Sequence, residues 1–267
     1  MPGMKRAFVD TRLGQIHYVT AGSGPPVMLL HQTPRSWDEY RDVIPLLSSS
    51  GFQVFAMDTI GFGDSARLNG PASVEAFADG ALAFMEAIGL ERASIVGHHT
   101  GGVIAVELAA SHPERINKLV LSGTTCVDAE GRRLAAEWPS IDQVTFSPDG
   151  SHLAELWRKR QPYYPADRPD LLQRLVIDAL KVIDTVEDGH IAVDNFHMED
   201  RLPKIKCPTL LMCGTEDWAA FPDLPRLAAY LPQAKVVEVL GAGVPMVDQV
   251  PDEFAAIVID FLSAAPS

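Results

Sequence analysis

The 267-residue chain is 47% hydrophobic and carries a formal net charge of −13, with a sequence pI near 5.0. This length is enough for one large α/β domain with an insertion. The acidic balance argues against a surface for nucleic acid or for an anionic membrane, because both attract basic proteins. We therefore expect a small-molecule partner, and the sequence leaves the oligomeric state open.

Two further features favour a cytoplasmic protein. Residues 1–11 are charged and lack the apolar run of a signal peptide, and no later stretch reaches the length of a transmembrane helix. The three cysteines are an odd number without metal-ligand spacing, and Cys207 and Cys213 lie on one expected strand, too far apart to be bridged. Reduced thiols of this kind are typical of the cytoplasm.

The first part of the chain alternates between expected strands and helices. Strands are expected at residues 5–10, 15–20, 27–30, 53–57, 93–96 and 118–121. Helical spacing is found at 37–47, where Pro45 interrupts it, at 73–89, with Ser73 as N-cap, and at 101–110. Short connections between alternating strands and helices predict a parallel, doubly wound sheet of the α/β class.

The alternation stops between residues 124 and 201. This stretch is rich in Trp, Tyr, Arg and Asp, and it has helical segments near 153–160 and 171–183. The earlier pattern returns with a strand at 207–213, a helix near 224–231, a strand at 235–240 and a helix at 252–262. We therefore predict a core of residues 1–123 and 202–267, with a helical cap inserted at residues 124–201.

Residues 97–101 read Gly-His-His-Thr-Gly and lie between an expected strand and an expected helix. A tight strand-to-helix turn between two glycines is how α/β hydrolases present a nucleophile, in the pattern Gly-x-Ser-x-Gly. The chain keeps both outer glycines, Gly97 and Gly101, and places His99 at the serine position. This segment resembles in particular the nucleophile elbows of epoxide hydrolases and dehalogenases.

Five other segments resemble the α/β-hydrolase fold superfamily, in the same order along the chain. They are the first hairpin with Ile16-His17-Tyr18, the oxyanion loop His31-Gln32-Thr33-Pro34, the segment from Asp58 to Ser65, the strand from Cys207 that leads to Asp217, and the loop from Gly241 to Phe254. The resemblance covers almost the whole chain. It implies an α/β-hydrolase fold with a mostly parallel sheet and an inserted helical cap, and we expect no cofactor and no metal.

The chain departs from this family at two catalytic positions. His99 replaces the nucleophile, and Val244 stands where the family has its catalytic histidine. Asp217, at the position of the family's acid, is kept. Thr100 is one place out of register and no histidine follows His197, so a conventional triad is not expected.

His99 is the main candidate for a catalytic residue. A strained elbow conformation persists only where the surroundings enforce it, so a bulky side chain there points to a function. An imidazole is largely neutral at pH 7 and needs no separate base, so it could attack a carbonyl or accept a proton. We expect His99 to reach into the space left at Val244 and to hydrogen-bond Asp217, which would fix its tautomer. The alternatives are a histidine that plugs an inactive pocket and a solvated carboxylate at Asp217.

The expected oxyanion hole consists of the backbone N–H groups of Thr100 and of Gln32 or Thr33. Gln32 replaces a glycine of the family and adds a side-chain donor. Arg35 lies next to this loop and could meet an anionic substrate, with an exposed salt bridge as the equal alternative. His31 is expected to brace the loop.

The remaining candidates would contact substrate or support the elbow. Substrate contacts are predicted for His31, Arg35, Trp138, Trp157 and Val244. The aromatic residues of the cap, Trp138, Trp157, Tyr163, Tyr164 and Phe196, would divide between the cap interior and the pocket wall, and they suit an apolar or aromatic substrate. His98 is expected to pack behind the elbow. A metal site from His31, His98 and His99 is a weaker alternative, because adjacent histidines diverge.

Three functions remain open at this point. The first is an enzyme that hydrolyses or cleaves a small ester- or ketone-type carbonyl compound, with His99 as nucleophile or general base. The second is a cofactor-free lyase or oxygenase-type reaction, in which His99 takes a proton from an enolisable substrate and the oxyanion hole holds the enolate. The third is a ligand-binding or sensor protein that kept the pocket and lost the chemistry.

Overall fold

The computed structural model of the protein describes residues 3–137 and 139–265. Trp138, one of the predicted substrate contacts, therefore lies outside the described residues. In the described part of the chain, no helix is long and apolar enough to cross a membrane.

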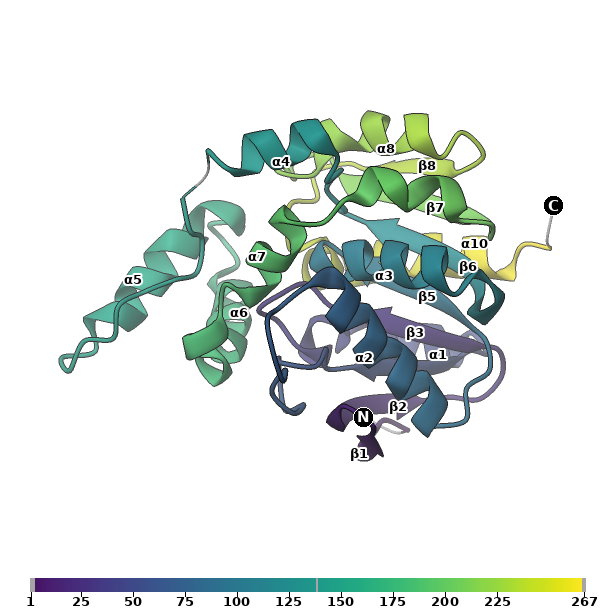
Figure 1. The fold of residues 1–267 in the computed structure, drawn as a ribbon, viewed down its shortest axis with the longest axis horizontal. Helices are drawn as coiled ribbons and strands as arrows, with labels where there is room; N and C mark the ends of the chain where they lie inside the picture. The colour runs from purple at the N-terminus through teal and green to yellow at the C-terminus, as the bar shows by residue number, and fades with distance from the viewer. Residues whose placement is uncertain (1–2, 138, 266–267) are drawn as a thin grey trace.

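An eight-stranded sheet forms the centre of the fold, in the order β1-β2-β4-β3-β5-β6-β7-β8 (Figure 1). The strands are β1 (Lys5–Thr11), β2 (Gly14–Ala21), β3 (Pro26–Leu30), β4 (Gln53–Met57), β5 (Ala93–His98), β6 (Ile116–Ser122), β7 (Thr209–Gly214) and β8 (Lys235–Val239). β2 pairs antiparallel with β1 and β4, and the remaining pairs are parallel. The predicted α/β class and the mostly parallel sheet are confirmed.

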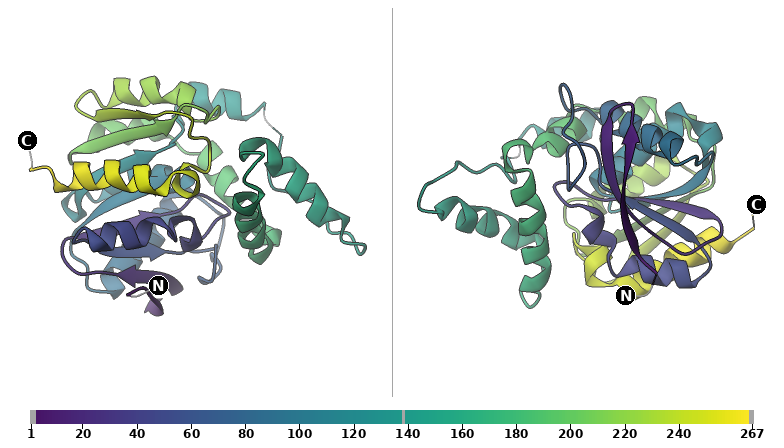
Figure 2. Two further views of the ribbon diagram at one scale, coloured as in Figure 1. Left: turned by 180° about the vertical axis from the view of Figure 1, so that it is seen from behind. Right: turned by 90° about the horizontal axis from the view of Figure 1, so that it is seen from below.

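Helices cover both faces of this sheet, as Figures 1 and 2 show. One face carries α2 (Val74–Ala87), α3 (Thr100–Ser111) and α8 (Leu224–Tyr230), and the other carries α1 (Val43–Ser49) and α10 (Pro251–Ser263). Along β3, Met28 and Leu30 join the core on the first face, while Val27 and Leu29 join the core on the second. A strand with both faces covered needs apolar residues at every position, which explains the continuous run in this part of the sequence.

The first helical segment differs from its prediction. A short 3-10 helix at Trp37–Tyr40 precedes α1, and the break between them falls at residues 41–42. Pro45 lies in the first turn of α1, where a backbone N–H has no partner within the helix, so the ring interrupts nothing. The prediction that Pro45 breaks this segment was wrong. The N-cap of α2 is as predicted, since Ser73 accepts a hydrogen bond from the N–H of Ala76.

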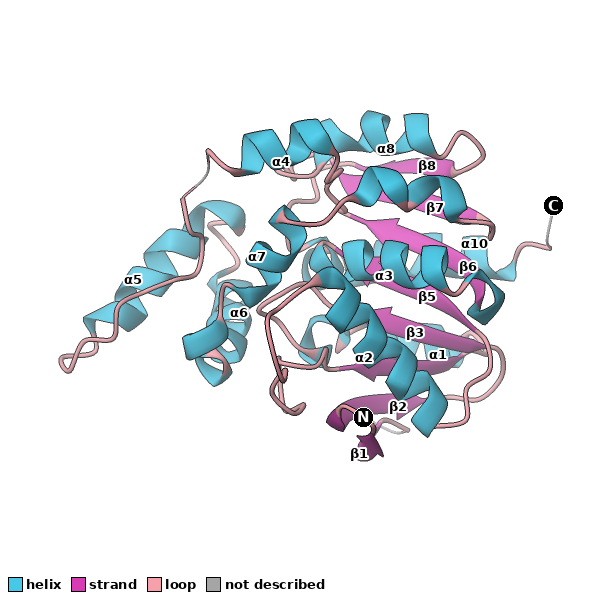
Figure 3. Ribbon diagram, viewed as in Figure 1, coloured by secondary structure: helices cyan, strands magenta, loops and turns pink. Residues whose placement is uncertain are grey.

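Between β6 and β7, the described residues form the α-helices α4 (Ala129–Ala135), α5 (Ser151–Arg160), α6 (Pro169–Lys181) and α7 (Asp188–Asp194). Figure 3 shows α5 and α6 beyond the end of the sheet, with α7 between them and α3. The boundaries of a cap at 124–201 stay a prediction, and α4 and α7 were not predicted.

The other elements are short. They are α9 (Met246–Gln249) and the 3-10 helices Pro113–Arg115, Gln161–Tyr163, Ile183–Thr185, Met198–Asp200, Leu202–Lys204 and Phe221–Asp223.

Candidate active site

His99 lies at the turn between β5 and α3, with φ +47° and ψ −116°. Among the described residues, it is the one non-glycine residue with a positive φ. The two outer glycines make this turn possible, because a Cβ on Gly97 would lie 2.3 Å from the carbonyl oxygen of Gly101, and one on Gly101 would lie 2.0 Å from that of Leu30. The backbone thus holds His99 in a conformation that side chains rarely adopt.

The His99 ring is paired with Asp217, which follows β7. Its Nε2 lies 2.8 Å from Oδ2 of Asp217, and the other carboxylate oxygen accepts the N–H of Ala220 at 3.0 Å. Burial alone would raise the pKa of Asp217, but the charge and hydrogen bond of His99 outweigh burial and lower it. The carboxylate is therefore ionised and acts as an acceptor for His99.

Two small residues leave room for this pair. Val244 lines the same cavity as His99 and offers no polar side-chain atom in place of the usual histidine. Gly123, after β6, has φ +51°, and a Cβ there would lie 2.9 Å from Nε2 of His99 and 3.1 Å from Oδ2 of Asp217. Gly123 was missed in the sequence, because nothing local connects it to a residue more than ninety positions later.

The second ring nitrogen of His99, Nδ1, has no hydrogen-bond partner among the described residues. Nδ1 is not a buried atom without a partner, because the His99 side chain is 14% exposed in the cavity wall. Nδ1 is therefore accessible from the cavity. This arrangement holds one nitrogen against a carboxylate and offers the other to a ligand, as a catalytic histidine requires.

His98 lies behind the elbow and is fully buried. Its Nδ1 lies 2.9 Å from Oγ of Ser122 and its Nε2 lies 2.9 Å from the carbonyl oxygen of Val244. Burial, with the nearby His99, lowers the pKa of His98 to about 3, so the ring is neutral. Both nitrogens are engaged by the protein, which leaves none for a metal shared with His99.

The oxyanion loop after β3 differs in part from its prediction. The N–H of Gln32 donates to Oε2 of Glu39 at 2.9 Å, and its side-chain amide lies 2.6 Å from Oε1 of the same carboxyl group. Gln32 lines the cavity, but its backbone N–H is used by Glu39, so its predicted backbone role in the oxyanion hole does not fit. Thr33 and Thr100 remain, with their hydroxyl oxygens 3.0 Å apart in the cavity wall.

Three of the predicted substrate contacts, His31, Trp157 and Arg35, do not line the cavity. His31 is fully buried, with Nδ1 against the carbonyl oxygen of Gln32 at 2.7 Å and Nε2 accepting the N–H of Thr59 at 2.9 Å. It braces the loop and cannot reach a ligand. Trp157, on α5, packs against a buried cluster of Tyr164 and residues of α6, and it does not line the cavity.

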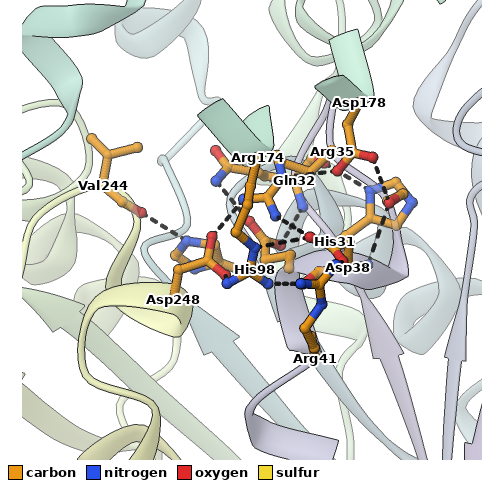
Figure 4. A network of polar contacts seen from close by, with 12 residues as sticks. His31, Gln32, Arg35, Asp38, Arg41, His98, Arg174, Asp178, Val244 and Asp248 are labelled. Atoms are coloured by element: carbon orange, nitrogen blue, oxygen red, sulfur yellow. Dashed lines mark hydrogen bonds and ion pairs between the residues drawn. The ribbon is translucent and has the colours of Figure 1, made fainter. Parts of the chain in front are cut away.

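Arg35 is neither an anion site nor an exposed salt bridge. Its guanidinium is fully buried, with Nε 3.0 Å from Asp178 and Nη1 2.5 Å from Asp248 (Figure 4). Because these two carboxylates occupy the guanidinium, Arg35 cannot contact substrate.

The cavity beside His99 has a volume of about 480 Å³. Small-molecule sites commonly fall between about 300 and 1,000 Å³. Its walls come from the elbow, from α4, α7 and the loops of the region predicted as the cap, and from the segment after β7. Two aromatic side chains, Tyr163 and Trp218, line it with ring centroids 5.1 Å apart. Arg160 and His190, which were not predicted from the sequence, are polar residues of its wall.

A different part of the fold brings together possible metal ligands. Ligand atoms of His17, Asp58 and Asp64 lie within 4.8 Å of one another. Asp58 already accepts hydrogen bonds from the N–H groups of Trp37 and Asp64 and lies 2.8 Å from Nδ1 of His17. None of the three lines the cavity, and this contact network orders the loops beneath it.

Comparison with known proteins decides the family. Residues 25–182 match the family described as alpha/beta hydrolase fold. The chain belongs to the α/β-hydrolase fold family. This α/β hydrolase is 35% identical over 127 residues to the bifunctional epoxide hydrolase 2 of Rattus norvegicus, a match that covers 45% of the chain and 22% of the rat protein. It is 27% identical over 271 residues to the haloalkane dehalogenase 2 of Mycobacterium bovis, covering 94% of the chain and 92% of that protein.

A solved structure resembles the whole α/β hydrolase. The enol-lactonase of Burkholderia xenovorans LB400 superposes with a TM-score of 0.79 at 24% identity, covering 97% of this chain and 100% of that one. At this identity the likeness establishes the fold. The chain spans less than a third of the length of the epoxide hydrolases that head its curated relatives. These epoxide hydrolases are hydrolases by name, and the relative that matches over most of its length is named a dehalogenase.

Proposed function

We propose that this chain hydrolyses a small ester or lactone, with His99 as the general base that activates a water molecule. The observation that carries the proposal is the 2.8 Å contact between Nε2 of His99 and Oδ2 of Asp217. A carboxylate only accepts hydrogen bonds, so the neutral imidazole carries its proton on Nε2. The lone pair is then on Nδ1, the nitrogen that is accessible from the cavity.

General-base catalysis fits this geometry better than attack by the ring itself. Nδ1 is bonded to Cγ, so the Cβ and backbone of His99 crowd the approach of a carbonyl carbon. A water molecule needs only hydrogen-bond reach to give a proton to Nδ1. The resulting hydroxide adds to the carbonyl carbon, and the negative charge moves to the carbonyl oxygen.

The first turn of α3 supplies the stabilisation of that charge. The N–H of Thr100 has no acceptor among the described residues, and it lies at the positive end of the helix dipole. Thr33 completes the donor set in place of Gln32. The collapse of the intermediate breaks the bond to the leaving oxygen, which needs a proton.

The relatives and the cavity support the reaction class and the substrate class. The sequence relatives are named as an epoxide hydrolase and a haloalkane dehalogenase. Tyr163 and Trp218 line a cavity in which apolar surface exceeds polar surface. An apolar or aromatic acyl compound of small size suits these walls.

The test uses aromatic esters, short esters, lactones and β-diketones with the parent and three variants. We expect His99→Ala to lower kcat by about 10² to 10⁴, the usual share of general-base catalysis. Asp217→Asn should also lower kcat, because an amide can favour the wrong tautomer of the ring. The control is His112→Ala, at a histidine that does not line the cavity, and it should leave kcat unchanged.

Equal rates for the parent and His99→Ala would overturn the proposal. If the parent binds a ligand saturably but turns over none of the compounds, the sensor protein is favoured. Preferential cleavage of the β-diketones, again lost in His99→Ala, would instead favour proton abstraction from an enolisable substrate.

A further inference from the structure

The cavity beside His99 is lined by a second histidine with a ring nitrogen that no hydrogen bond uses. His190 lies on α7, and its side chain is 25% exposed in the cavity wall. The preceding residue, Gly189, is so close to the oxyanion loop that a Cβ there would lie 1.9 Å from Oγ1 of Thr33. The hydroxyl of Thr33 also contacts Thr100, which is next to His99, so α7 packs beside the elbow, and His190 and His99 line the same cavity.

One nitrogen of the His190 ring is fixed by two buried charges. Nε2 lies 3.2 Å from Oδ2 of Asp142 and 3.2 Å from Nη2 of Arg160. Asp142 and Arg160 form an ion pair with Nε of Arg160 2.5 Å from Oδ1, and both are almost fully buried. Burial opposes ionisation of Asp142, but Arg160 and His190 outweigh burial and hold its pKa well below the usual range.

The other nitrogen, Nδ1, is open to the cavity. It has no hydrogen-bond partner among the described residues, and it is not one of the buried polar atoms without a hydrogen bond. The ring resembles His99 in that Nε2 is held at a carboxylate and Nδ1 is open, and it differs in that Nη2 of Arg160 also lies near Nε2.

A purely structural role does not explain this placement. The Asp142 carboxylate already accepts two hydrogen bonds from the Arg160 guanidinium, so the pair is satisfied without an imidazole. The Oε1 atom of Glu187, another charge in this wall, accepts the N–H groups of Asp142 and Gln143 and is occupied in the same way. Of these groups, the imidazole is the one that keeps a polar atom without a hydrogen-bond partner.

We propose that His190 is a second catalytic residue, the general acid that protonates the leaving oxygen. This inference rests on the proposed function of His99. In the step, the bond between the carbonyl carbon and the leaving oxygen breaks, its electron pair stays on that oxygen, and the proton on Nδ1 of the imidazolium of His190 is transferred to it. His99 has by then gained one proton from water, and His190 has lost one to the leaving oxygen. Solvent then removes the proton from His99 and returns one to His190.

The experiment is a leaving-group series with one acyl group and alcohols or phenols of increasing pKa. A general acid matters most for poor leaving groups, because a good one departs without a proton. For His190→Gln, we expect kcat/KM to fall at least 10²-fold for alkyl and phenyl esters but less than about threefold for the 4-nitrophenyl ester. His99→Ala should slow the whole series, because water must be activated for every ester.

His197→Gln is the matched control, at an exposed histidine that does not line the cavity. A urea unfolding curve confirms that His190→Gln is folded, and His190→Asn is the second variant. A loss that is uniform across the series, or no loss, overturns the role of His190 and leaves that of His99 intact. Absence of turnover by the parent, or an unchanged rate in His99→Ala, overturns both.

Discussion

Glu39 is fully buried beneath the oxyanion loop, where it accepts two hydrogen bonds from Gln32. Burial raises its pKa to about 8, although the charge of Arg35 and the hydrogen bonds from Gln32 oppose the shift. Between the ordinary value of 4.5 and 8, the folded protein therefore keeps a proton that the unfolded chain has lost. Stability from this group is greatest below pH 4.5 and is lost as the pH rises toward 8.

The Glu39→Gln variant should remove this pH dependence. Its amide keeps an acceptor for the N–H of Gln32 but binds no proton in this range. Relative to the parent, its free energy of unfolding should rise by about 1 kcal/mol per pH unit between about pH 5 and 8. Urea unfolding at four pH values measures the difference, with Glu253→Gln at an exposed carboxyl as control. Parallel curves for the parent and Glu39→Gln would contradict the prediction.

Residues of the elbow could be predicted because their signal is local. Gly97, His99 and Gly101 are within five positions of one another, and Asp217 follows its strand at a fixed place. The partner of Gln32 could not be predicted in this way. Glu39 is seven residues further on, and only the path of the 3-10 helix at Trp37–Tyr40 turns its side chain back under the loop.

At the scale of elements, a buried ion network joins α6 to the core. Arg35 pairs with Asp178 on α6 and with Asp248 on α9. Figure 4 shows Arg174 of α6 beside this cluster of charged side chains. Nη1 of Arg174 lies 3.0 Å from Oδ1 of Asp248 but without hydrogen-bond geometry. The network holds α6 in place over the loop that contains Arg35.

Removal of Arg35 should be far more costly than removal of an exposed arginine of the same network. Arg35→Met leaves Asp178 and Asp248 buried without their main partner, which should lower the free energy of unfolding by about 3 to 5 kcal/mol. Arg41, 44% exposed, pairs with Asp38, and Arg41→Met should change it by less than about 1 kcal/mol. Urea unfolding at pH 7 compares the two. Similar midpoints would show that Arg35 does not stabilise the attachment of α6.

Elements of the sheet could be predicted more completely than elements over the cavity. Strands such as β3 and β7 are buried on both faces, so their sequences are continuous apolar runs. α4 and α7 have only seven residues each, too few for an apolar stripe of the usual length, and α7 places the polar side chains of His190 and Asp194 in the cavity wall. The same property that hid α7 in the sequence makes His190 available to a ligand.

At the scale of the whole molecule, the region predicted as the cap enters and leaves the core through neighbouring strands. β6 precedes it and β7 follows it, and the two are neighbouring parallel strands inside the sheet. The segment from residue 143 to 147 has no regular backbone structure, and Phe146 within it is 76% exposed. Exposed segments of this kind are preferred sites of proteolytic cleavage.

Brief treatment with chymotrypsin should therefore cut the chain after Phe146 before it cuts within the sheet. Residues 1–146 and 147–267 should stay together on a sizing column, because β6 and β7 hold them in one sheet. Phe146→Ser should resist this first cut, while Phe8→Ser should not, since Phe8 is in paired β1 although it is 53% exposed. Mass spectrometry identifies the fragments. Separation of the two pieces, or a first cut within a strand, would contradict a cap inserted into a core that folds around it.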